Sequence, residues 1–268
     1  MLLVWLAASP LALADDPPTS ARVVDVYDGD TFTLSNGDRV RLRGINTPEM
    51  KPPEPYALQA KAAASRMILN KTVTLHYSEP ARDGYGRLLA SIEVEGQDLA
   101  TELIRQGYGH IFIIPPEQLD AAPMVAAQAE ARAERRGIWK TRSYSGQMHI
   151  TSFHPNAPGR DQDNLNGEYM RICNVSTEPL DFSGWMLKNR AKDEYTMPAL
   201  TIPVGHTVMV FSGPGNHQDD PSLQLQVYLN NETPVWDNAS EKAILYDTAG
   251  EKIDWRVHSV KDPSKVTD

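Results

Sequence analysis

Three short segments in the first third of the chain hold charged and polar residues that together could act on a phosphodiester. Residues 28–31 read Asp-Gly-Asp-Thr, residues 41–49 read Arg-Leu-Arg-Gly-Ile-Asn-Thr-Pro-Glu, and residues 83–87 read Asp-Gly-Tyr-Gly-Arg. Hydrolysis of that bond needs a cation to offset the phosphate charge, a group that positions water, and donors for oxygens that gain charge in the transition state. The three segments contain residue types for each of these tasks.

Oxygen atoms suited to a hard metal ion occur in the first two segments. Asp30 offers a carboxylate, Asn46 an amide oxygen and Thr47 a backbone oxygen. The three come within reach of one another if the first and third strands are adjacent. Oxygen ligands of this kind favour Ca²⁺ or Mg²⁺, so these residues are the predicted metal site.

Acid–base and phosphate-binding groups complete the set. Glu49 follows Pro48, whose fixed φ sets the direction of the loop, and its carboxylate could hold and partly deprotonate an attacking water. Arg41 and Arg87 each present a planar fork of donors to phosphate oxygens and stay charged at any working pH. Tyr85 is a candidate to stack on a base or to contact the phosphate.

Each segment also has a purely structural interpretation. An Asp-Gly-Asp triplet is commonly a turn, an arginine on a strand commonly points to water, and Thr-Pro-Glu begins many helices. Chemistry is indicated only because all three segments occur in order on one predicted fold. Zinc is not indicated, because the seven histidines show no ligand spacing, and Cys173, the single cysteine, cannot form an intrachain disulfide.

The elements around these segments predict a small barrel. Stretches that alternate apolar and polar residues predict strands, and Asp-Gly and Asn-Gly predict turns between them. One alanine-rich stretch has the spacing of a helix. The predicted strands are 22–27, 31–35, 39–45, 72–77 and 88–94, and the predicted helix is 56–70. Five strands with a helix after the third are typical of an OB-type β-barrel.

Two further helices are expected after the barrel. They cover residues 98–106 and 117–136 and end at Gly107 and Gly137, where a glycine suits a left-handed helix end. Pro123 lies inside the second pattern, and we expect it to kink or interrupt that helix.

The character of the chain changes near residue 148. Residues 140–147 form a short polar linker, and from there on β-rich runs alternate with turn residues as in a β-sandwich. We therefore expect one domain at 19–142 and a second at 148–257. Since each has its own apolar residues, the first is expected to fold and act alone.

The barrel half resembles the staphylococcal nuclease family. The three segments above carry the resemblance, together with Leu-Ile-Arg-Gln-Gly at 103–107 and Gly-Ile-Trp at 137–139. It implies an α+β OB-fold nuclease that depends on Ca²⁺ and cleaves DNA and RNA. The roles it implies are metal binding by Asp30, Asn46 and Thr47, catalysis by Arg41, Glu49 and Arg87, and substrate binding by Tyr85, Arg41 and Arg87.

Three positions depart from the family pattern. Asn46 stands where the family has a second metal carboxylate, Ile113 where the staphylococcal enzyme has a nucleotide-contacting tyrosine, and Gly84 lies in a loop that is basic in the family. An amide keeps a ligand oxygen but removes one unit of charge, which weakens the attraction for Ca²⁺.

The second half resembles the lamin-tail family, whose fold is an immunoglobulin-like sandwich. The resemblance lies in residues 164–174, 180–187, 202–208 and 243–247. It implies binding or tethering rather than catalysis, and the ligand is unknown. Trp185 and Trp236 are interpreted as core residues, because large aromatic side chains dominate sandwich cores.

The first fourteen residues are almost wholly apolar and end in Ala-Leu-Ala before Asp15. Residues 1–14 are therefore expected to be a signal peptide, although no Lys or Arg precedes the apolar run; the alternative is a buried N-terminal segment. A secreted or periplasmic location follows from the first interpretation. No later apolar run approaches the ~20 residues of a transmembrane helix, so none is expected in the mature chain.

Charge narrows the choice of function. Residues 19–142 carry no net charge and residues 143–268 carry −7, which disfavours non-specific coating of DNA. If the substrate is a nucleic acid, a few arginines and a metal would hold it. The protein is expected to be a monomer.

The alternative function is that of a non-catalytic nucleic-acid-binding OB module in an envelope-binding protein. The presence of Asp30, Arg41, Glu49 and Arg87 favours the enzyme.

Overall fold

The structure is a computed structural model that describes residues 16–117 and 119–260. The predicted signal peptide, residues 1–14, lies outside the described residues. Within the described part of the chain, no helix is both long enough and apolar enough to cross a membrane.

The first half is a closed five-stranded barrel. Its strands are β1 (Ser20–Val26), β2 (Thr31–Leu34), β3 (Arg39–Leu42), β5 (Thr72–Arg82) and β6 (Leu88–Val94). They follow the order β3-β2-β1-β5-β6, and a parallel pairing of β3 with β6 closes the ring. The predicted OB-type barrel is confirmed. The strand predicted at 72–77 is longer than expected, because its pairing with β6 resumes at Arg82 after an irregularity.

The barrel interior follows the period-two pattern of its strands. Along β6 the side chains alternate strictly between buried and accessible, which puts Leu88, Ala90 and Ile92 in the core. Phe32 and Leu42 fill the same core from β2 and β3. The three polar segments lie on and next to these strands, so the apolar core fixes their spacing.

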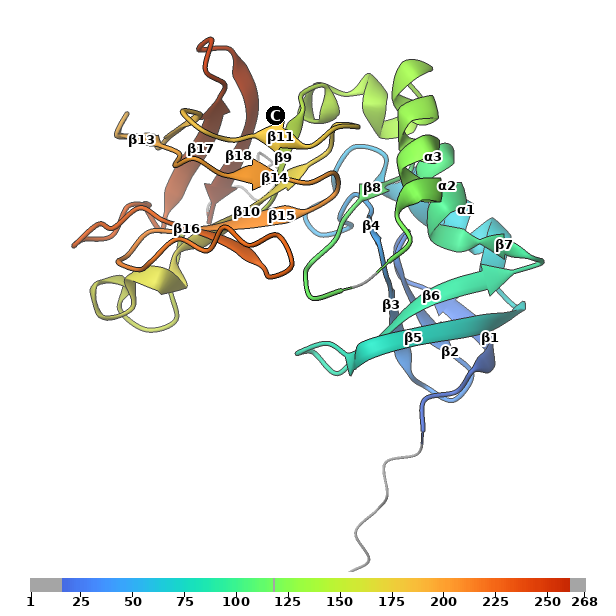
Figure 1. The fold of residues 1–268 in the computed structure, drawn as a ribbon. Coiled ribbons are helices and arrows are strands. Elements are labelled where there is room, and N and C mark those ends of the chain that lie inside the picture. The colour runs from blue at the N-terminus through green and yellow to red at the C-terminus, as the bar shows by residue number, and fades with distance from the viewer. Residues whose placement is uncertain (1–15, 118, 261–268) are drawn as a thin grey trace, which may run out of the picture.

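Three helices gather at one end of the barrel (Figure 1). They are α1 (Ala57–Ile68), α2 (Leu99–Arg105) and α3 (Ala122–Ala133). The helix predicted at 117–136 is shorter than expected, and Pro123 lies in its first turn. The predicted kink was wrong for a physical reason: a first-turn residue has no intrahelical N–H bond to lose, so proline starts the helix instead of breaking it.

The second half is an all-β, immunoglobulin-like sandwich. One sheet has the order β16-β15-β10-β9 and the other β13-β12-β17-β18. The first comprises β9 (Met148–His154), β10 (Tyr169–Asn174), β15 (Thr207–Phe211) and β16 (Leu225–Tyr228); the second comprises β12 (Met186–Lys188), β13 (Glu194–Thr196), β17 (Ser240–Tyr246) and β18 (Lys252–Ser259). Trp185 and Trp236 are buried in the core between them, as predicted.

Short elements complete both halves. The chain adds two small ladders, β4 (Ile45–Asn46) with β8 (His110–Ile111) and β11 (Leu180–Asp181) with β14 (Thr201–Ile202), and an edge strand β7 (Gln97–Asp98). One 3₁₀ turn, 137–140, leads into the predicted linker and a second, 142–144, lies within it, where Tyr144 is buried. The segment between the halves is thus packed rather than extended.

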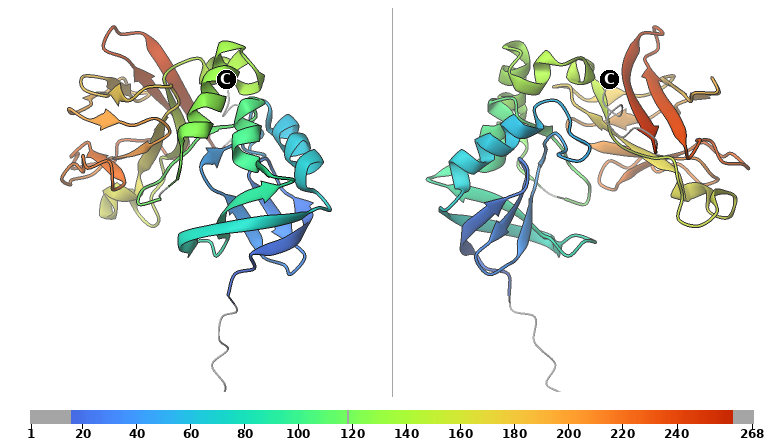
Figure 2. Two further views of the ribbon diagram at one scale, coloured as in Figure 1. Left: turned by 45° about the vertical axis from the view of Figure 1, so that its right-hand side comes forward. Right: turned by 180° about the vertical axis from the view of Figure 1, so that it is seen from behind.

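The two halves lie side by side (Figure 2), and buried polar groups connect them. Gln128 of α3 is fully buried; its Oε1 accepts the N–H of Ile111, and its Nε2 donates to the carbonyls of Val175 and Ser176 at 3.1 and 3.0 Å. A buried amide satisfied from both sides favours one fixed arrangement. Independent folding of residues 19–142 stays a prediction, and this interface weighs against it.

An ion pair also crosses the interface. Arg256 on β18 approaches Glu54 of the first half, with 2.5 Å between Nη1 and Oε1, and the two side chains are 14% and 6% exposed. Removing one partner of a buried pair leaves the other charge without compensation.

We expect Arg256→Met to lower the free energy of unfolding by about 3 kcal/mol. The Glu54→Gln/Arg256→Met double variant should recover part of that loss, because neither charge is then left alone. Urea denaturation measures both. The control is Arg160→Met, which breaks an exposed pair with Asp163 and should cost less than about 1 kcal/mol. Equal losses for the two single variants would contradict the buried pair.

Candidate active site

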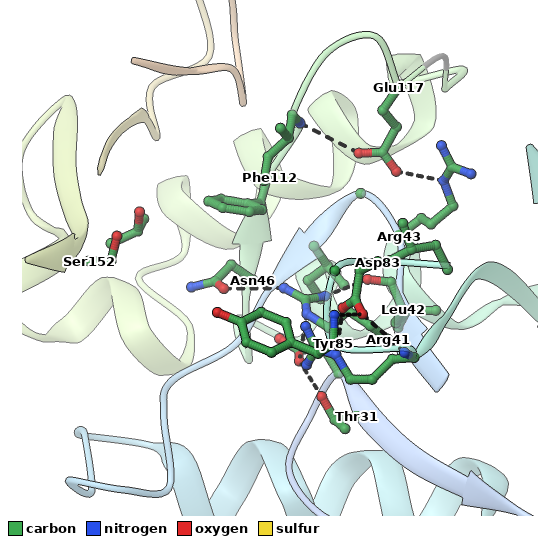
Figure 3. A pocket seen from close by; sticks show the side chains of 18 of the residues that line it. Thr31, Arg41, Leu42, Arg43, Asn46, Asp83, Tyr85, Phe112, Glu117 and Ser152 are labelled. Carbon is green, nitrogen blue, oxygen red and sulfur yellow. Dashed lines mark hydrogen bonds and ion pairs between the residues drawn. The ribbon is translucent and has the colours of Figure 1, made fainter. Parts of the chain in front are cut away.

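The second half of the chain is called the tail domain below, and its sheet β16-β15-β10-β9 the tail sheet. A cavity of about 650 Å³ opens between the barrel and the tail sheet. Figure 3 shows Arg41, Asn46 and Tyr85 gathered on one side of it and Ser152 on the other. The sequence-predicted residues that line it are Asp30, Arg41, Asn46, Glu49, Tyr85 and Arg87. The cavity therefore brings together residues from all three segments.

The turn between β1 and β2 carries two buried carboxylates. Asp28 Oδ1 accepts the backbone N–H groups of Asp30 and Thr31 at 3.0 and 2.7 Å, which closes the turn on its own side chain. Gly29 lies so close to Thr47 that a Cβ would come within 2.7 Å of the threonine methyl. Any larger residue at 29 would push the turn off the neighbouring strand segment.

Asp30 is held from several directions. Its Oδ2 accepts both the N–H and the hydroxyl of Thr47, at 2.8 and 2.9 Å. Its Oδ1 accepts the Thr31 hydroxyl and lies 3.3 Å from Nε of Arg41. Only 5% of Asp30 is exposed, so these donors replace the water that the carboxylate has lost. Thr47 itself is buried behind Asp30 and does not line the cavity.

Arg41 connects the carboxylate to the amide of residue 46. Its Nη1 donates to the carbonyl of Leu42, and its Nη2 lies 3.3 Å from Asn46 Oδ1. The guanidinium is only 14% exposed, and its charge faces Asp30. The first and third strands are not adjacent as expected, because β2 lies between them; Asp30 reaches Arg41 because it directly precedes Thr31, the residue of β2 that pairs with Arg41 of β3.

Arg87 is oriented by the turn that precedes it. Asp83 accepts the Arg87 backbone N–H at 3.0 Å and its Nε at 2.7 Å, and also accepts the N–H of Tyr85. Among the described residues, the Nη atoms of Arg87 have no hydrogen-bond partner. A guanidinium held by Nε presents those two nitrogens to a ligand. Tyr85 is 88% exposed and its ring lies beside the Arg87 guanidinium, 5.5 Å from centroid to Cζ.

Glu49 stands on a loop closed by reciprocal hydrogen bonds. The N–H of Glu49 donates to Glu54 Oε2 at 2.9 Å, and the N–H of Glu54 donates to the Glu49 carbonyl at 2.8 Å. The other oxygen of Glu54 forms the ion pair with Arg256. The loop that carries Glu49 is therefore tied to the tail domain.

Two acidic groups of the cavity, Asp28 and Glu49, have raised pKa values. Burial, and then the charge of Asp30, raise the pKa of Asp28 to about 7. The side chain of Glu49 is reached from the cavity, yet desolvation between the walls, and the carboxylates of Asp30 and Glu54, raise its pKa. Carboxylates this close disfavour one another's charge, and a cation among them would relieve that repulsion.

The oxygen atoms on this wall are suited to bind a hard cation. Asp28, Asp30, Glu49 and Asn46 supply only carboxylate and amide oxygens on this wall, the ligand type of Ca²⁺ and Mg²⁺. Within residues 16–117 and 119–260, no three His, Cys, Asp or Glu side chains meet at metal-binding distance. An oxygen site here would therefore need the amide, backbone or water oxygens as well.

Sequence reasoning missed several residues of this site. Asp28 belongs to the first segment and Asp83 to the third, so both were within the recognised patterns but had no assigned role. Glu54 and Arg256 carry no sequence signal, because they meet only through the interface. Thr47 was expected to offer its backbone oxygen, and the structure adds that its N–H and hydroxyl hold Asp30.

Comparison with known families divides the chain as the fold does. The family described as Staphylococcal nuclease homologue matches residues 39–141, and the Lamin Tail Domain family matches residues 141–259. Both resemblances inferred from the sequence, and their order, are confirmed.

Individual relatives match the barrel half. A thermonuclease of Staphylococcus intermedius is 30% identical over 122 residues, which are 43% of this chain and 73% of the relative. An uncharacterized endonuclease of Escherichia coli is 31% identical over 143 residues, 52% of this chain and 86% of the relative. A thermonuclease of Staphylococcus hyicus is 27% identical over 125 residues, 44% and 74% of the two chains. These similarities support a nuclease.

The raised pKa of Asp28 predicts that the metal-free protein loses stability as pH rises. Between about pH 4 and 7 the folded state keeps a proton that the unfolded state has released, so stability falls through that window. Between pH 4.5 and pH 8, in the presence of chelator, the unfolding free energy of the native protein should decrease. We expect this decrease to exceed that of the Asp28→Asn variant by on the order of a few kcal/mol.

Urea denaturation across this pH range measures the difference. Asp219→Asn, at an exposed position, is the matched control and should keep the native profile. A constant difference between the native protein and Asp28→Asn would contradict the raised pKa.

Proposed function

Because the chain belongs to the family of staphylococcal nuclease homologues, we propose that it is a calcium-dependent nuclease that hydrolyses phosphodiester bonds of DNA and RNA. The observation that carries the proposal is the joint placement of two guanidinium groups, Arg41 and Arg87, with Glu49 around one cavity. These are the donors and the acid–base group that such a reaction requires.

The two arginines are suited to bind a phosphate because each is fixed by its own carboxylate. Asp30 and Asn46 orient Arg41, and Asp83 orients Arg87 through Nε. Pre-oriented donors need no reorganisation when the phosphate oxygens gain charge, and a single donor of this kind can be worth about 10²–10³ in kcat. The exposed ring of Tyr85 lies where a neighbouring base or sugar would pass.

Glu49 is suited to accept a proton from the attacking water. Burial, and then the charges of Asp30 and Glu54, raise its pKa, which makes this carboxylate a better base than an ordinary glutamate. Its loop is held by Glu54, which fixes the backbone from which the Glu49 side chain extends into the cavity.

Calcium would be held on the same wall by Asp30 and Asn46, with Asp28 nearby; Thr47, which does not line the cavity, would support the ion by holding Asp30 through its N–H and hydroxyl. When bound, such a cation offsets charge on the phosphate. The protein's own residues determine where that charge is offset, because the β1–β2 turn fixes Asp28 and Asp30 within one loop.

We expect Glu49→Gln and Arg87→Ala each to lower kcat by at least about 10² while binding of an oligonucleotide changes much less, because both groups act on the transition state. The assay is cleavage of plasmid DNA and of RNA in Ca²⁺, in Mg²⁺ and in chelator. Arg66→Ala, at an exposed position on α1, is the control and should cleave at the native rate.

Two outcomes would overturn the proposal. Native rates in both variants would mean that the assigned residues are wrong. Binding without cleavage by the native protein, in any metal, would favour the alternative of a non-catalytic OB module.

We also propose that the protein is exported and that its tail domain binds or tethers it outside the cytoplasm. The support is the apolar segment at 1–14 and the match to the Lamin Tail Domain family. N-terminal sequencing of the protein recovered from the medium or periplasm should begin at Asp15. Recovery of a chain that begins at Met1 would contradict export by cleavage.

A further inference from the structure

The wall of the cavity opposite the nuclease residues comes from the tail domain. Its residues lie on β9 and β10 and are Thr151, Ser152, His154, Tyr169 and Arg171. Tyr85 of the barrel and Tyr169 of the tail sheet both line the cavity, and burial, and then the nearby phenol of Tyr85, raise the pKa of Tyr169. A substrate bound at Arg87 and Tyr85 would therefore meet the tail sheet.

Arg171 gives this second wall a positive charge that no acidic residue neutralises. Its Nη1 donates to two uncharged acceptors, Thr207 Oγ1 at 2.9 Å and Gln224 Oε1 at 2.7 Å. In the described part of the chain, no carboxylate lies within ion-pair distance of it. Burial lowers the pKa of this guanidinium, as expected where a cation is desolvated without a counter-ion. An anion in the cavity would supply the missing charge.

The held orientation of Arg171 favours a phosphate. Gln224 is itself fixed, because its Nε2 donates to the carbonyls of Thr207 and Leu225. The planar fork of an oriented guanidinium matches two oxygens of one phosphate.

Beside Arg171, a row of rings crosses the tail sheet. His154, Tyr169, Phe211 and Tyr228 occupy paired positions on its four adjacent strands. His154 stacks on Tyr169 with 4.3 Å between ring centroids and 25° between planes, and Phe211 stacks on Tyr228. Because Tyr169 and Arg171 are two residues apart on β10, the row and the guanidinium share one face.

The outer ring of the row is the one suited to a ligand. His154 is exposed at the end of the edge strand β9 and lines the cavity. One of its faces stacks on Tyr169, and no described ring or charged group stacks on the other. Burial, and then the charge of Arg171, lower its pKa, so the ring is mainly neutral at pH 7 and can stack on a base.

The size of the cavity limits what can lie between the two walls. Its volume of about 650 Å³ is within the range of pockets that hold drug-sized ligands, about 300–1,000 Å³, which corresponds to one or two nucleotides. A volume of this size favours a single strand over a duplex between the two walls. A charged groove lined by stacking rings is also the usual means of holding a single strand.

We propose that the tail sheet is the second half of the substrate site: Arg171 binds the phosphate next to the one cleaved, and His154 stacks on the adjoining base, so that the protein accepts single-stranded DNA or RNA. This inference rests on the nuclease activity proposed above. It makes the tail domain part of the substrate site in addition to any tethering role.

The test compares three substrates in the full-length protein. They are a labelled single-stranded dodecamer, the same sequence in a blocked hairpin duplex, and a nitrophenyl phosphodiester that contains one phosphate. Hydrolysis of the small ester reports the catalytic groups alone. If the native protein does not hydrolyse the ester, the proposed nuclease function is contradicted. If it does, the oligonucleotide results test the tail site separately.

Two variants address the two contacts, with Arg190→Gln, an exposed arginine of the tail domain, as the control. For Arg171→Gln and for His154→Ala, we expect KM for the dodecamer to rise about tenfold, and the ratio of dodecamer to ester hydrolysis (kcat/KM) to fall by the same factor. Native protein should cut the hairpin at least about tenfold more slowly than the single strand.

Salt dependence separates a phosphate contact from a structural role. Arg171→Gln should reduce the slope of log affinity against log salt by about 0.7, the value for one phosphate on a single strand, while His154→Ala should leave it unchanged. Native KM and salt slope in both variants, or equal cleavage of hairpin and single strand, would overturn the proposal. His154 is exposed, so its variant remains informative even if Arg171→Gln fails to fold.

Discussion

The carboxylate of Asp30 is the group on which the site depends. It lies where little water reaches it, so it requires donors from the protein. Those donors are the neighbouring Thr31 at the start of β2, Arg41 on β3, and Thr47 after β4. The contacts that offset its desolvation thereby fix the turn and the two strand ends relative to one another. Arg41 is held in the same network, so the stability of the buried charge and the orientation of a phosphate-binding group have one cause.

Crowding of acids beside this network gives the site its electrostatic character. Asp28 shares the turn with Asp30, and Glu49 lies near both, so the neighbouring carboxylates and burial raise the free energy of the ionised forms of Asp28 and Glu49. A barrel whose function were only structural would gain by replacing one of them. Their presence around a cavity that also contains two oriented guanidinium groups is the pattern of a site organised for a cation and an anionic substrate.

The tail domain is coupled to the site by packing and by charge. Gln128 and the Glu54–Arg256 pair fix its position against the barrel, and β9 and β10 then form the far wall of the cavity. Domain interfaces with buried, satisfied polar groups tolerate few alternative arrangements. A wall held in this way can take part in selecting the substrate, which a flexibly linked binding module could not do.

The sequence by itself determined the barrel strands, the first helix, the all-β tail and the candidate residues from Asp30 to Arg87, because period-two alternation, turn glycines and ordered motifs are local properties of the chain. Pro123 showed the limit of local reasoning: whether a proline breaks or begins a helix depends on where the first turn lies, which neighbouring elements decide. Only the tertiary structure decided that Thr47 supports Asp30, that Arg256 secures the loop of Glu49, and that Arg171 faces the nuclease wall. Each of these arrangements depends on buried or charged contacts between residues that are far apart in the sequence. Such contacts produce no periodic pattern in the sequence from which they could be predicted.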